Sequence, residues 1–537
     1  MQHSAARELG SEGPLPEPLM HRRLALPFLL LAPALGAQVA IEPSAFVIRN
    51  GHDTLVVERF ARTDGTITGR VTAKGQPEFR YRAFLGPGHS VDSMHMGVYA
   101  PGVAADAKPL QEARVILRGD SVLIRNTGGG RDFATQPGAL PLLNNSYALT
   151  ELYTERARAH GDSADIPGFA LNGGVTLAVA VRPLAADSVV LTVVGQVNRL
   201  RVDATGRILG GTMPSAGLVI TRVEGAVASR IALGKPDYSA PAGAPYTARE
   251  VTVPRDGFTL GGTLTLPSGV TGRVPAVVTI TGSGQQDRDE YIAVAGGYRP
   301  FRQVADTLGR RGIAVLRLDD RMIGASGGTV GTSADYADDV RAAVAWLREQ
   351  PEIDPERIAL VGHSEGGLIA PMVAATDPRL KGAVLMAGPS QTGRQILTFQ
   401  QKQAIDLEPS IAPASRDSAY RANMAKTDSS AATNPWLRYF LAYDPLATAS
   451  RVTTVPILIL QGATDHQVTP EQAPALERAF TAAGNRDVTM RVFPELNHLF
   501  IHDPSGLPSG YGALTSNLVD PEVLGVLADW LAVRLAR

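Results

Sequence analysis

A serine flanked by glycines is the first group in this sequence with the setting of a nucleophile. Ser364 lies in Gly362-His-Ser-Glu-Gly366, between an apolar run at 358–361 and a helix-compatible segment at 368–375. A sharp turn from strand to helix strains the backbone of the serine, and only small neighbours let the two elements close around it. The hydroxyl then projects clear of the sheet. We therefore predict that Ser364 is a catalytic nucleophile.

A serine hydroxyl near neutral pH needs a histidine base, and the base needs a carboxylate that fixes its tautomer. His498 follows the strand-like run at 488–492, where a loop can carry an imidazole over the edge of a sheet; the alternative is a plain loop histidine. Asp465 follows the apolar run at 455–460 and is the predicted acid, the alternative being an Asx-turn or a helix cap. Glu495 is a weaker rival, because it lies close to His498 along one loop. The other histidines after residue 250 are His363, beside the nucleophile and with no expected partner role, His466 and His502.

A glycine-containing segment, Thr281-Gly-Ser-Gly-Gln-Gln-Asp-Arg-Asp-Glu290, follows an earlier apolar run. Glycines let a backbone approach a reacting carbonyl, so the Ser283 amide is a predicted oxyanion donor, with Gly284 as the next candidate. The Glu365 amide, immediately after the nucleophile and at the start of a helix, is the other donor. A phosphate loop is the alternative, but the segment lacks the Lys-Ser/Thr pair of a nucleotide site.

Apolar runs alternate with helical segments from about residue 250 to the end of the chain. Runs that are apolar on both faces indicate a mostly parallel sheet covered by helices on both sides, with ligands at the carboxyl ends of its strands. Residues 258–267 are predicted to form an opening hairpin. The segment from about 391 to 450 interrupts this rhythm and is predicted to be a helical cap. Its aromatic residues are candidates for an apolar acyl pocket or, alternatively, for the core of the cap: Phe399, Trp436, Tyr439 and Phe440.

Residues 38–235 have a different pattern, with short β-branched runs separated by Asn, Asp and Gly turns. This pattern predicts an antiparallel β-rich domain with one helix near 148–159. His89 and His95 are predicted to lie in a plain loop and not to bind a metal. The Pro-rich stretch at 236–247 is predicted to be a stiff linker to a catalytic domain at 248–537.

Composition restricts the possible functions further. The chain has 537 residues, too many for one ordinary domain, and a formal net charge of -1. That balance gives no reason to expect a nucleic acid or an anionic membrane as partner. The chain has no cysteine, which excludes disulfides and cysteine-bound metals. No metal or cofactor is predicted, and the oligomeric state is left open.

The beginning of the chain has the pattern of a secretory signal. Met20-His-Arg-Arg23 precedes a short apolar stretch that ends in small residues at 34–37, so residues 1–37 are predicted to be an upstream extension and a signal peptide. Cleavage is expected after Gly36, and the mature chain is expected in the periplasm or outside the cell. The apolar stretch is too short and too Pro-broken for stable membrane insertion.

Six motifs in order carry a resemblance to a known family. Together they resemble bacterial α/β-hydrolase esterases of the serine-aminopeptidase-like group over about residues 250–535. The resemblance implies an α/β-hydrolase fold, the order Ser364, Asp465, His498 for the triad, and activity on small acyl esters. One departure is Asp320-Arg321-Met322, where the family has Asp-Arg-Gly, which puts the geometry of that turn in doubt. The motifs are Thr281-Gly-Ser-Gly-Gln-Gln-Asp-Arg-Asp, Leu318-Asp-Asp-Arg-Met-Ile-Gly-Ala-Ser-Gly327, Gly362-His-Ser-Glu-Gly366, Tyr443-Asp-Pro445, Gln461-Gly-Ala-Thr-Asp-His-Gln-Val468 and Asn497-His498-Leu-Phe.

The sequence therefore predicts a serine hydrolase that cleaves small carboxylic esters. An aminopeptidase or amidase with the same triad is the nearest alternative, because only the pocket discriminates esters from amides. Asp406 and Glu408 would be its candidate carboxylates for binding a free amino terminus. The alternative from another class is a binding protein that retains an inactive hydrolase scaffold.

Overall fold

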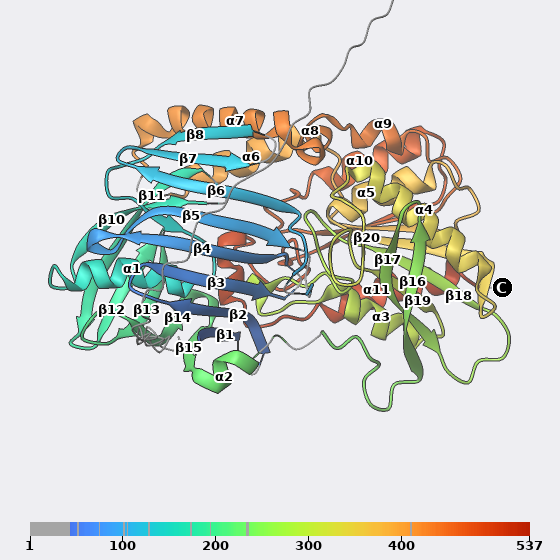
Figure 1. Cartoon of the computed structure of the whole chain (residues 1–537). Coiled ribbons are helices and arrows are strands. Elements are labelled where there is room, and N and C mark those ends of the chain that lie inside the picture. The colour runs from blue at the N-terminus through green and yellow to red at the C-terminus, as the bar shows by residue number, and fades with distance from the viewer. Residues whose placement is uncertain are drawn as a thin grey trace, which may run out of the picture. The chain divides into compact units, whose positions relative to one another are not determined.

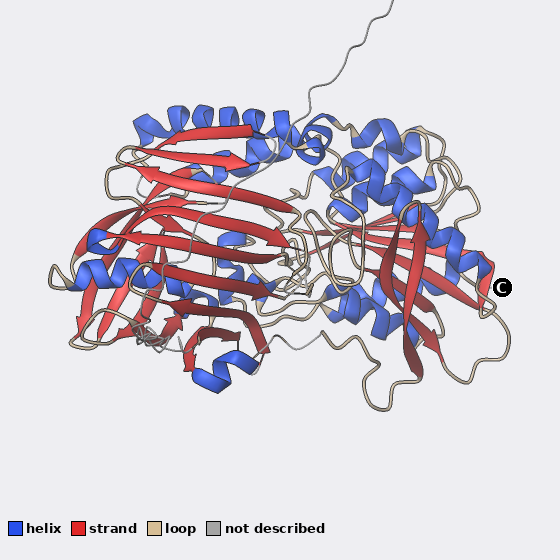
Figure 2. Ribbon diagram, viewed as in Figure 1, coloured by secondary structure: helices blue, strands red, loops and turns tan. Residues whose placement is uncertain are grey.

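Two β-sheets, one of fifteen strands and one of eight, organise the computed structural model of this chain (Figures 1 and 2). The structure describes residues 43–536, except positions 51–52, 75, 100–102, 105, 127–128, 172–173, 194, 232, 234–235 and 409–410. The predicted signal peptide lies outside the described residues. Within them, no helix is long and apolar enough to cross a membrane.

The first sheet is antiparallel throughout, except where β9 runs parallel to β10. Its order, β8-β7-β6-β5-β4-β3-β2-β1-β15-β14-β13-β12-β11-β10-β9, is two meanders joined where β1 pairs with β15. The predicted antiparallel β-rich region is confirmed. The strands are β1 Ser44–Asn50, β2 Asp53–Arg62, β3 Thr66–Ala73, β4 Glu78–Gly86, β5 Ser90–Tyr99, β6 Gln111–Arg118, β7 Ser121–Asn126, β8 Gly129–Ala134, β9 Leu140–Leu142, β10 Ala164–Ala170, β11 Val175–Ala185, β12 Ser188–Val193, β13 Gln196–Val202, β14 Ile208–Met213 and β15 Leu218–Glu224.

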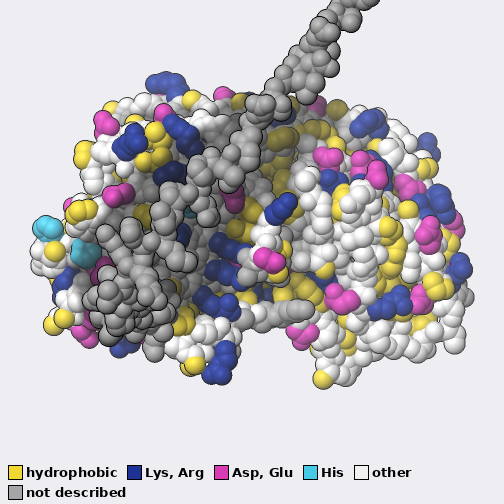
Figure 3. Space-filling model, viewed as in Figure 1, with side chains coloured by type: hydrophobic (Ala, Val, Ile, Leu, Met, Phe, Trp, Pro, Cys, Tyr) yellow, Lys and Arg dark blue, Asp and Glu magenta, His cyan; other side chains and the backbone are white. Residues whose placement is uncertain are grey.

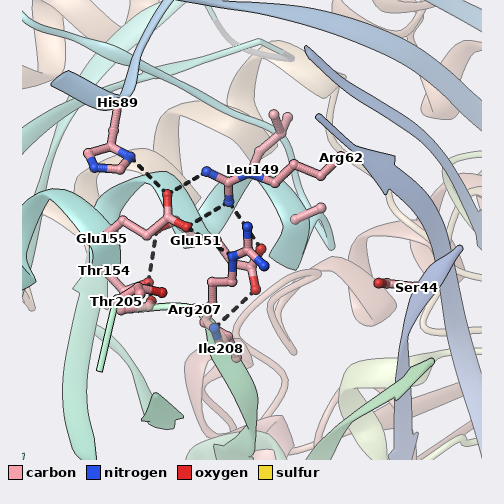
Figure 4. A network of polar contacts seen from close by, with 12 residues as sticks. Ser44, Arg62, His89, Leu149, Glu151, Thr154, Glu155, Thr205, Arg207 and Ile208 are labelled. Carbon is pink, nitrogen blue, oxygen red and sulfur yellow. Dashed lines mark hydrogen bonds and ion pairs between the residues drawn. The ribbon is translucent and has the colours of Figure 1, made fainter. Parts of the chain in front are cut away.

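Helix α1, Tyr147–Arg158, packs its apolar side chains against one face of this sheet. The Ser146 hydroxyl caps it by accepting the Leu149 amide at 3.3 Å. The helix also brings two buried carboxylates, Glu151 and Glu155, which are paired with Arg62 (Figure 4). Burial raises the pKa of Glu151 to about 7, although Arg222 and Arg62 oppose the shift. A short helix, α2 Gly225–Arg230, follows the last strand.

The loop predicted around His89 and His95 is wrong for His95, which lies in strand β5. His89 precedes that strand and its Nδ1 is 3.0 Å from Glu155 (Figure 4). The two histidines therefore lie in different settings, His95 within strand β5 and His89 beside Glu155. In the described part of the chain, no group of three or more His, Asp or Glu side chains is arranged to hold a metal ion.

The second sheet has the order β16-β17-β19-β18-β20-β21-β22-β23 and is parallel from β19 onward. The opening hairpin is formed by β16 with β17, so it begins earlier than the predicted residue 258. The predicted parallel sheet of apolar strands is confirmed. The strands are β16 Tyr246–Arg255, β17 Phe258–Pro267, β18 Val274–Ile280, β19 Ala314–Leu318, β20 Ile353–His363, β21 Ala383–Met386, β22 Ile457–Gly462 and β23 Val488–Phe493.

Helices cover both faces of this sheet, and a separate hydrophobic core lies on each side. Helices α4 Ser333–Glu349, α5 Glu365–Ala374 and α10 Gln472–Ala482 pack on one face. Helices α3 Pro300–Gly309 and α11 Pro521–Arg534 pack on the other. The predicted cap corresponds to α6 Gly393–Asp406, α7 Arg416–Thr433, α8 Pro435–Ala442 and α9 Pro445–Ala449.

The Pro-rich stretch before β16 has no helix or strand in its described residues, and the domain boundaries around it stay a prediction. It is nevertheless attached at Tyr238. The Tyr238 hydroxyl donates to Asp287 Oδ2 at 3.2 Å, and the Arg288 guanidinium lies 4.2 Å from the centre of its ring. At least this part of the predicted linker is therefore packed against the loop that follows β18.

Candidate active site

Ser364 is the single residue between strand β20 and helix α5. Its backbone has φ 54° and ψ −117°, a strained conformation for a residue with a side chain. Gly362 and Gly366 make the turn possible, because a Cβ at Gly362 would lie 2.1 Å from the Gly366 oxygen. The Ser364 amide donates to the Met386 carbonyl on β21 at 2.8 Å. The strained serine is thus fixed at the carboxyl edge of the parallel sheet, as the sequence predicts.

Asp465 and His498 are in direct contact, although they come from loops after two different strands, β22 and β23. His498 Nδ1 lies 2.8 Å from Asp465 Oδ2, and both side chains are almost fully buried. The other oxygen, Oδ1, accepts the backbone amides of Gln467 and Val468 at 2.7 and 2.9 Å. Gln461 donates its Nε2 to Oδ2 at 3.0 Å. Every side of the carboxylate is therefore occupied by a donor.

The rival acid Glu495 is directed elsewhere. Its Oε2 lies 3.2 Å from His502 Nε2 at the surface, where both side chains are more than half exposed. Among the described residues, no hydrogen bond links the Ser364 hydroxyl to His498 Nε2. Such contacts are often long in enzymes without substrate and shorten when substrate binds.

The two predicted oxyanion donors lie in segments next to the nucleophile. The Glu365 amide is at the first position of α5, where a helix leaves N–H groups without an internal partner. Ser283 is exposed in the loop after β18. That loop passes directly over the nucleophile, since a Cβ at Gly282 would lie 3.2 Å from Ser364 Cβ. Backbone N–H groups at these two places can face the same developing negative charge.

Asp320 fixes the other side of this loop. Its Oδ1 accepts the Thr281 hydroxyl and its Oδ2 the Gln286 amide, both at 2.9 Å. Burial raises the pKa of Asp320 well above its usual value, and the nearby charges of Glu365 and Glu290 raise it further. The two hydrogen bonds lower this pKa but do not offset the effect of burial. The neighbouring Met322, where the resembled family has glycine, adopts the left-handed conformation with φ 68°. The turn therefore keeps the left-handed conformation that a glycine would adopt, although the Met322 side chain makes this conformation strained.

The Glu365 side chain links the nucleophile turn to the cap. Its Oε1 accepts the Ser333 hydroxyl at 2.6 Å and the Trp436 indole N–H at 3.0 Å. Trp436 stacks on Phe440, with ring centres 5.3 Å apart, and Tyr439 stacks on Tyr443. Phe399 is the most exposed of the predicted pocket residues, at 38 %. Their role in binding an acyl group stays a prediction.

Known proteins are similar to this chain over the region that contains the candidate active site. The family model of serine aminopeptidase S33 matches residues 295–505, which contain Ser364, Asp465 and His498 but not Ser283. Esterase EstD of Thermotoga maritima is 28% identical over 304 residues, which are 55% of this chain and 69% of EstD. The C-terminal region of this chain is an α/β hydrolase of the serine-aminopeptidase-like group.

Two other proteins resemble this hydrolase at lower sequence identity than EstD. Dipeptidyl aminopeptidase BIII of Pseudoxanthomonas mexicana is 27% identical over 267 residues, 46% of this chain and 34% of that enzyme. A solved esterase structure from Pyrococcus furiosus is 18% identical and covers 55% of this chain and 93% of its own, with a TM-score of 0.37.

A buried pair that the sequence did not predict lies beside the nucleophile of the hydrolase. His363 Nδ1 is 2.6 Å from Glu290 Oε1, and its Nε2 is 2.9 Å from the backbone carbonyl of His498. The same Glu290 oxygen accepts the Gly282 amide at 3.2 Å. One carboxylate and one imidazole therefore connect the oxyanion loop, the nucleophile turn and the backbone of His498. The sequence assigned His363 no role as partner of the nucleophile, and the structure pairs it instead with Glu290.

The protonation of His363 follows from these contacts. A carbonyl on one side and a carboxylate on the other both call for an N–H donor, which favours the imidazolium. Burial by itself lowers the pKa of His363, but the Glu290 charge and hydrogen bond, with the His498 carbonyl, outweigh it and raise the pKa above 6.5. The pair therefore stabilises the fold most below pH 6.5, and this contribution is lost as the pH rises through the raised pKa.

Glu290→Gln tests this positioning role. The neutral amide keeps the shape of the side chain but removes the charge that raises the pKa of His363. We expect kcat to fall about tenfold, roughly 1.4 kcal/mol, with KM little changed. The loss of thermal stability between pH 6.5 and pH 9 should also become smaller than in the wild type. If kcat fell about tenfold while thermal stability depended on pH as it does in the wild type, the substitution would have disturbed the loop in general and not the charge on His363.

Proposed function

We propose that this chain is a serine esterase that cleaves carboxylic esters of small acyl groups through an acyl-enzyme. The observation that carries the proposal is the buried contact between His498 and Asp465, on loops that end two strands of the sheet that presents Ser364. The name of EstD supports ester cleavage as the reaction class. No metal or cofactor takes part in the proposed reaction.

The proposed steps use the groups already described. Ser364 Oγ attacks the ester carbonyl carbon while His498 Nε2 takes the hydroxyl proton. Asp465 keeps the Nδ1 proton of His498 in place and stabilises the imidazolium. The amides of Glu365 and Ser283 donate to the oxyanion, the proton passes to the departing alcohol, and water then cleaves the acyl-enzyme by the same steps.

An aminopeptidase is the second candidate, because the S33 family description and dipeptidyl aminopeptidase BIII both name peptide cleavage. A peptidase that takes free amino termini needs a carboxylate available in its cap. Asp406, one of the two predicted candidates, lies 3.3 Å from Arg416 and is already paired. This pairing favours the ester reaction.

A substrate panel tests the proposal against both alternatives. We expect purified chain to hydrolyse p-nitrophenyl acetate and butyrate with kcat/KM at least about a hundredfold above its values for aminoacyl-nitroanilides. The reason is that an ester needs no carboxylate to bind an ammonium group, and its alcohol leaves more readily than an amine. Faster nitroanilide cleavage would favour the aminopeptidase, and no cleavage of either would favour a binding protein with an inactive scaffold.

We also propose that the chain is exported, with the mature protein beginning near Ala37 in the periplasm or outside the cell. The proposal rests on the charged residues at 20–23 followed by the short apolar stretch. Sequencing the amino terminus of protein recovered from the exported fraction tests it. A chain that still begins at residue 1 or residue 20 and stays with the cytoplasmic fraction would contradict it.

A further inference from the structure

The outer face of the fifteen-stranded sheet carries two rows of cationic side chains that run across its strands. In the first row, Arg59 on β2 is opposite Arg70 on β3, and Arg70 is opposite Arg80 on β4. Like charges directly opposite one another destabilise a sheet. Here Glu78 reduces the repulsion, because its carboxylate pairs with both Arg70 and Arg80. The first row is therefore partly neutralised within the chain.

The second row begins two residues further along β4, at Arg82, and continues across β5, β6 and β7. Arg82 on β4 is opposite His95 on β5, His95 is opposite Arg114 on β6, and Arg114 is opposite Arg125 on β7. Arg125 pairs with Asp132 at 2.5 Å. Arg82 lies over the ring of Phe84, and within the described residues Arg114 has neither an ion pair nor a hydrogen bond.

The second row thus places three exposed basic side chains next to one another with one acid at its end. The inward residues of the same strands, Tyr81, Met94, Val115 and Val122, are buried in the core with α1, so the alternation of the strands directs the arginines outward. Figure 3 shows Lys and Arg side chains gathered over β2–β5 of this face. A chain with a net charge of -1 does not produce such a concentration by composition alone. An anion from outside the chain would remove the repulsion within the row.

The two rows line one open groove with a volume of about 670 Å³. Six arginines line it, and Glu112 is the single acid among its lining residues. Adjacent strands lie about 4.8 Å apart, so the second row repeats an arginine or histidine side chain at about that interval across four strands. This periodicity fits a linear polymer with an anionic group on each unit better than a single small anion.

The aromatic residues of the groove narrow the choice of polymer. Proteins that bind single-stranded nucleic acid combine a basic groove with aromatic faces on which bases stack. Of the aromatic residues that line this groove, Phe60 and Tyr81 are buried, and the Arg80 guanidinium lies 3.9 Å from the centre of the Tyr99 ring. Little aromatic surface is therefore left in the groove on which bases could stack. The planar fork of arginine binds carboxylates as well as phosphates, so a polymer whose anionic groups are carboxylates fits the row without stacked bases.

We propose that this groove binds a linear acidic polysaccharide that carries carboxylates. Arg82, His95 and Arg114 contact successive carboxylates along the polysaccharide. The partly neutralised first row lies along the other side of the bound polysaccharide. The β-rich region is then a carbohydrate-binding module that keeps the hydrolase on an acidic polymer. This site is separate from the residues assigned to the reaction.

Binding of a fluorescein-labelled polygalacturonate oligomer to the full chain, measured by fluorescence anisotropy at low salt, tests the proposal. We expect saturable binding that weakens as salt is added, because each paired carboxylate releases counterions. Arg82→Ala/Arg114→Ala should weaken binding about tenfold or more. The matched control is Arg199→Ala, an exposed arginine on β13 outside both rows, which should bind as the wild type does.

Three further measurements decide what the binding means. Neutral dextran should not compete, and an oligothymidylate of equal charge should compete less well than unlabelled polygalacturonate. The double variant should keep its thermal midpoint and its hydrolysis of p-nitrophenyl acetate, because both arginines are exposed and removing them relieves repulsion. Absence of binding by the wild type, equal binding by the double variant, or tighter binding of the oligothymidylate would each overturn the proposal.

Discussion

Ser364→Ala is expected to lower kcat for p-nitrophenyl acetate by about 10⁶-fold, the order of loss that follows removal of a triad serine. Without the hydroxyl no acyl-enzyme forms, and only binding and the oxyanion donors remain to assist direct attack by water. The fold should be unaffected, because the amide of residue 364 still donates to the Met386 carbonyl. Circular dichroism and the thermal midpoint check the fold alongside the kinetics.

A fluorophosphonate probe, which reacts with activated serines, provides the direct control. It should label the wild type and leave Ser364→Ala unlabelled. Ser283→Ala is the matched variant, because residue 283 is assigned through its backbone amide, which alanine retains. Its kcat should stay within about threefold of the wild type. Undiminished labelling of Ser364→Ala would show that another residue is the nucleophile.

Asp465→Asn is expected to lower kcat by about 10⁴-fold with little change in KM. The expected loss of kcat follows from the four donors that surround the Asp465 carboxylate. Oδ1 accepts two backbone amides, from Gln467 and Val468, so the amide oxygen of asparagine is retained on that side. The NH₂ group then faces His498, which must carry its proton on Nε2 and can no longer accept one from Ser364.

Glu495→Gln is the control for the acid. Its carboxylate contacts His502 at the surface and does not contact His498, so kcat should change by less than about twofold. If Glu495→Gln were severely impaired and Asp465→Asn were nearly normal, the acid would have been assigned to the wrong loop. The pH profile of kcat/KM should also keep its wild-type form in Glu495→Gln.

The parallel sheet and the contact between Asp465 and His498 could be predicted because their signals are local. Strands buried on both faces appear as continuous apolar runs, and each catalytic candidate directly follows such a run. The turn at Ser364 could be predicted from five consecutive residues, 362–366, because glycines stand at both ends of that segment. The strand β20 is longer than its apolar run, 358–361, because Ile353 already pairs with Val274 of β18.

The remaining features depend on pairings between distant residues. Strand β5 was missed because its buried positions, Val91, Met94 and Gly97, recur at every third residue, and a register shift at Phe84/Leu85 interrupts its pairing with β4. A period of three does not indicate a strand. The cationic rows were invisible for a related reason, since register between six strands decides which arginines lie side by side.

The pair of Glu290 and His363 shows the same limit at the active site. The two residues are 73 positions apart, and the carbonyl that His363 contacts is a further 135 positions along the chain. The motif that contains Glu290 was recognised, but the sequence gave no reason to connect its last carboxylate with the histidine beside Ser364. Gln461, which donates to Asp465, was likewise noticed only as part of a motif.

The pairing of β1 with β15 brings the first and last strands of the large sheet together, with Ser44 opposite Glu224. This is the strand pair with the greatest separation along the chain, and closing so long a loop is slow. The adjacent ends also make the region suitable for circular permutation. For the β-rich region taken without the hydrolase, a short linker from Glu224 to Ser44 and a new opening at the Gly119–Asp120 turn between β6 and β7 would keep each strand beside its neighbours. In the permuted region β1 and β15 form a local hairpin while β6 and β7 become the most distant pair, so the slow pairing should move to β6 and β7 and the face of arginines should be unchanged.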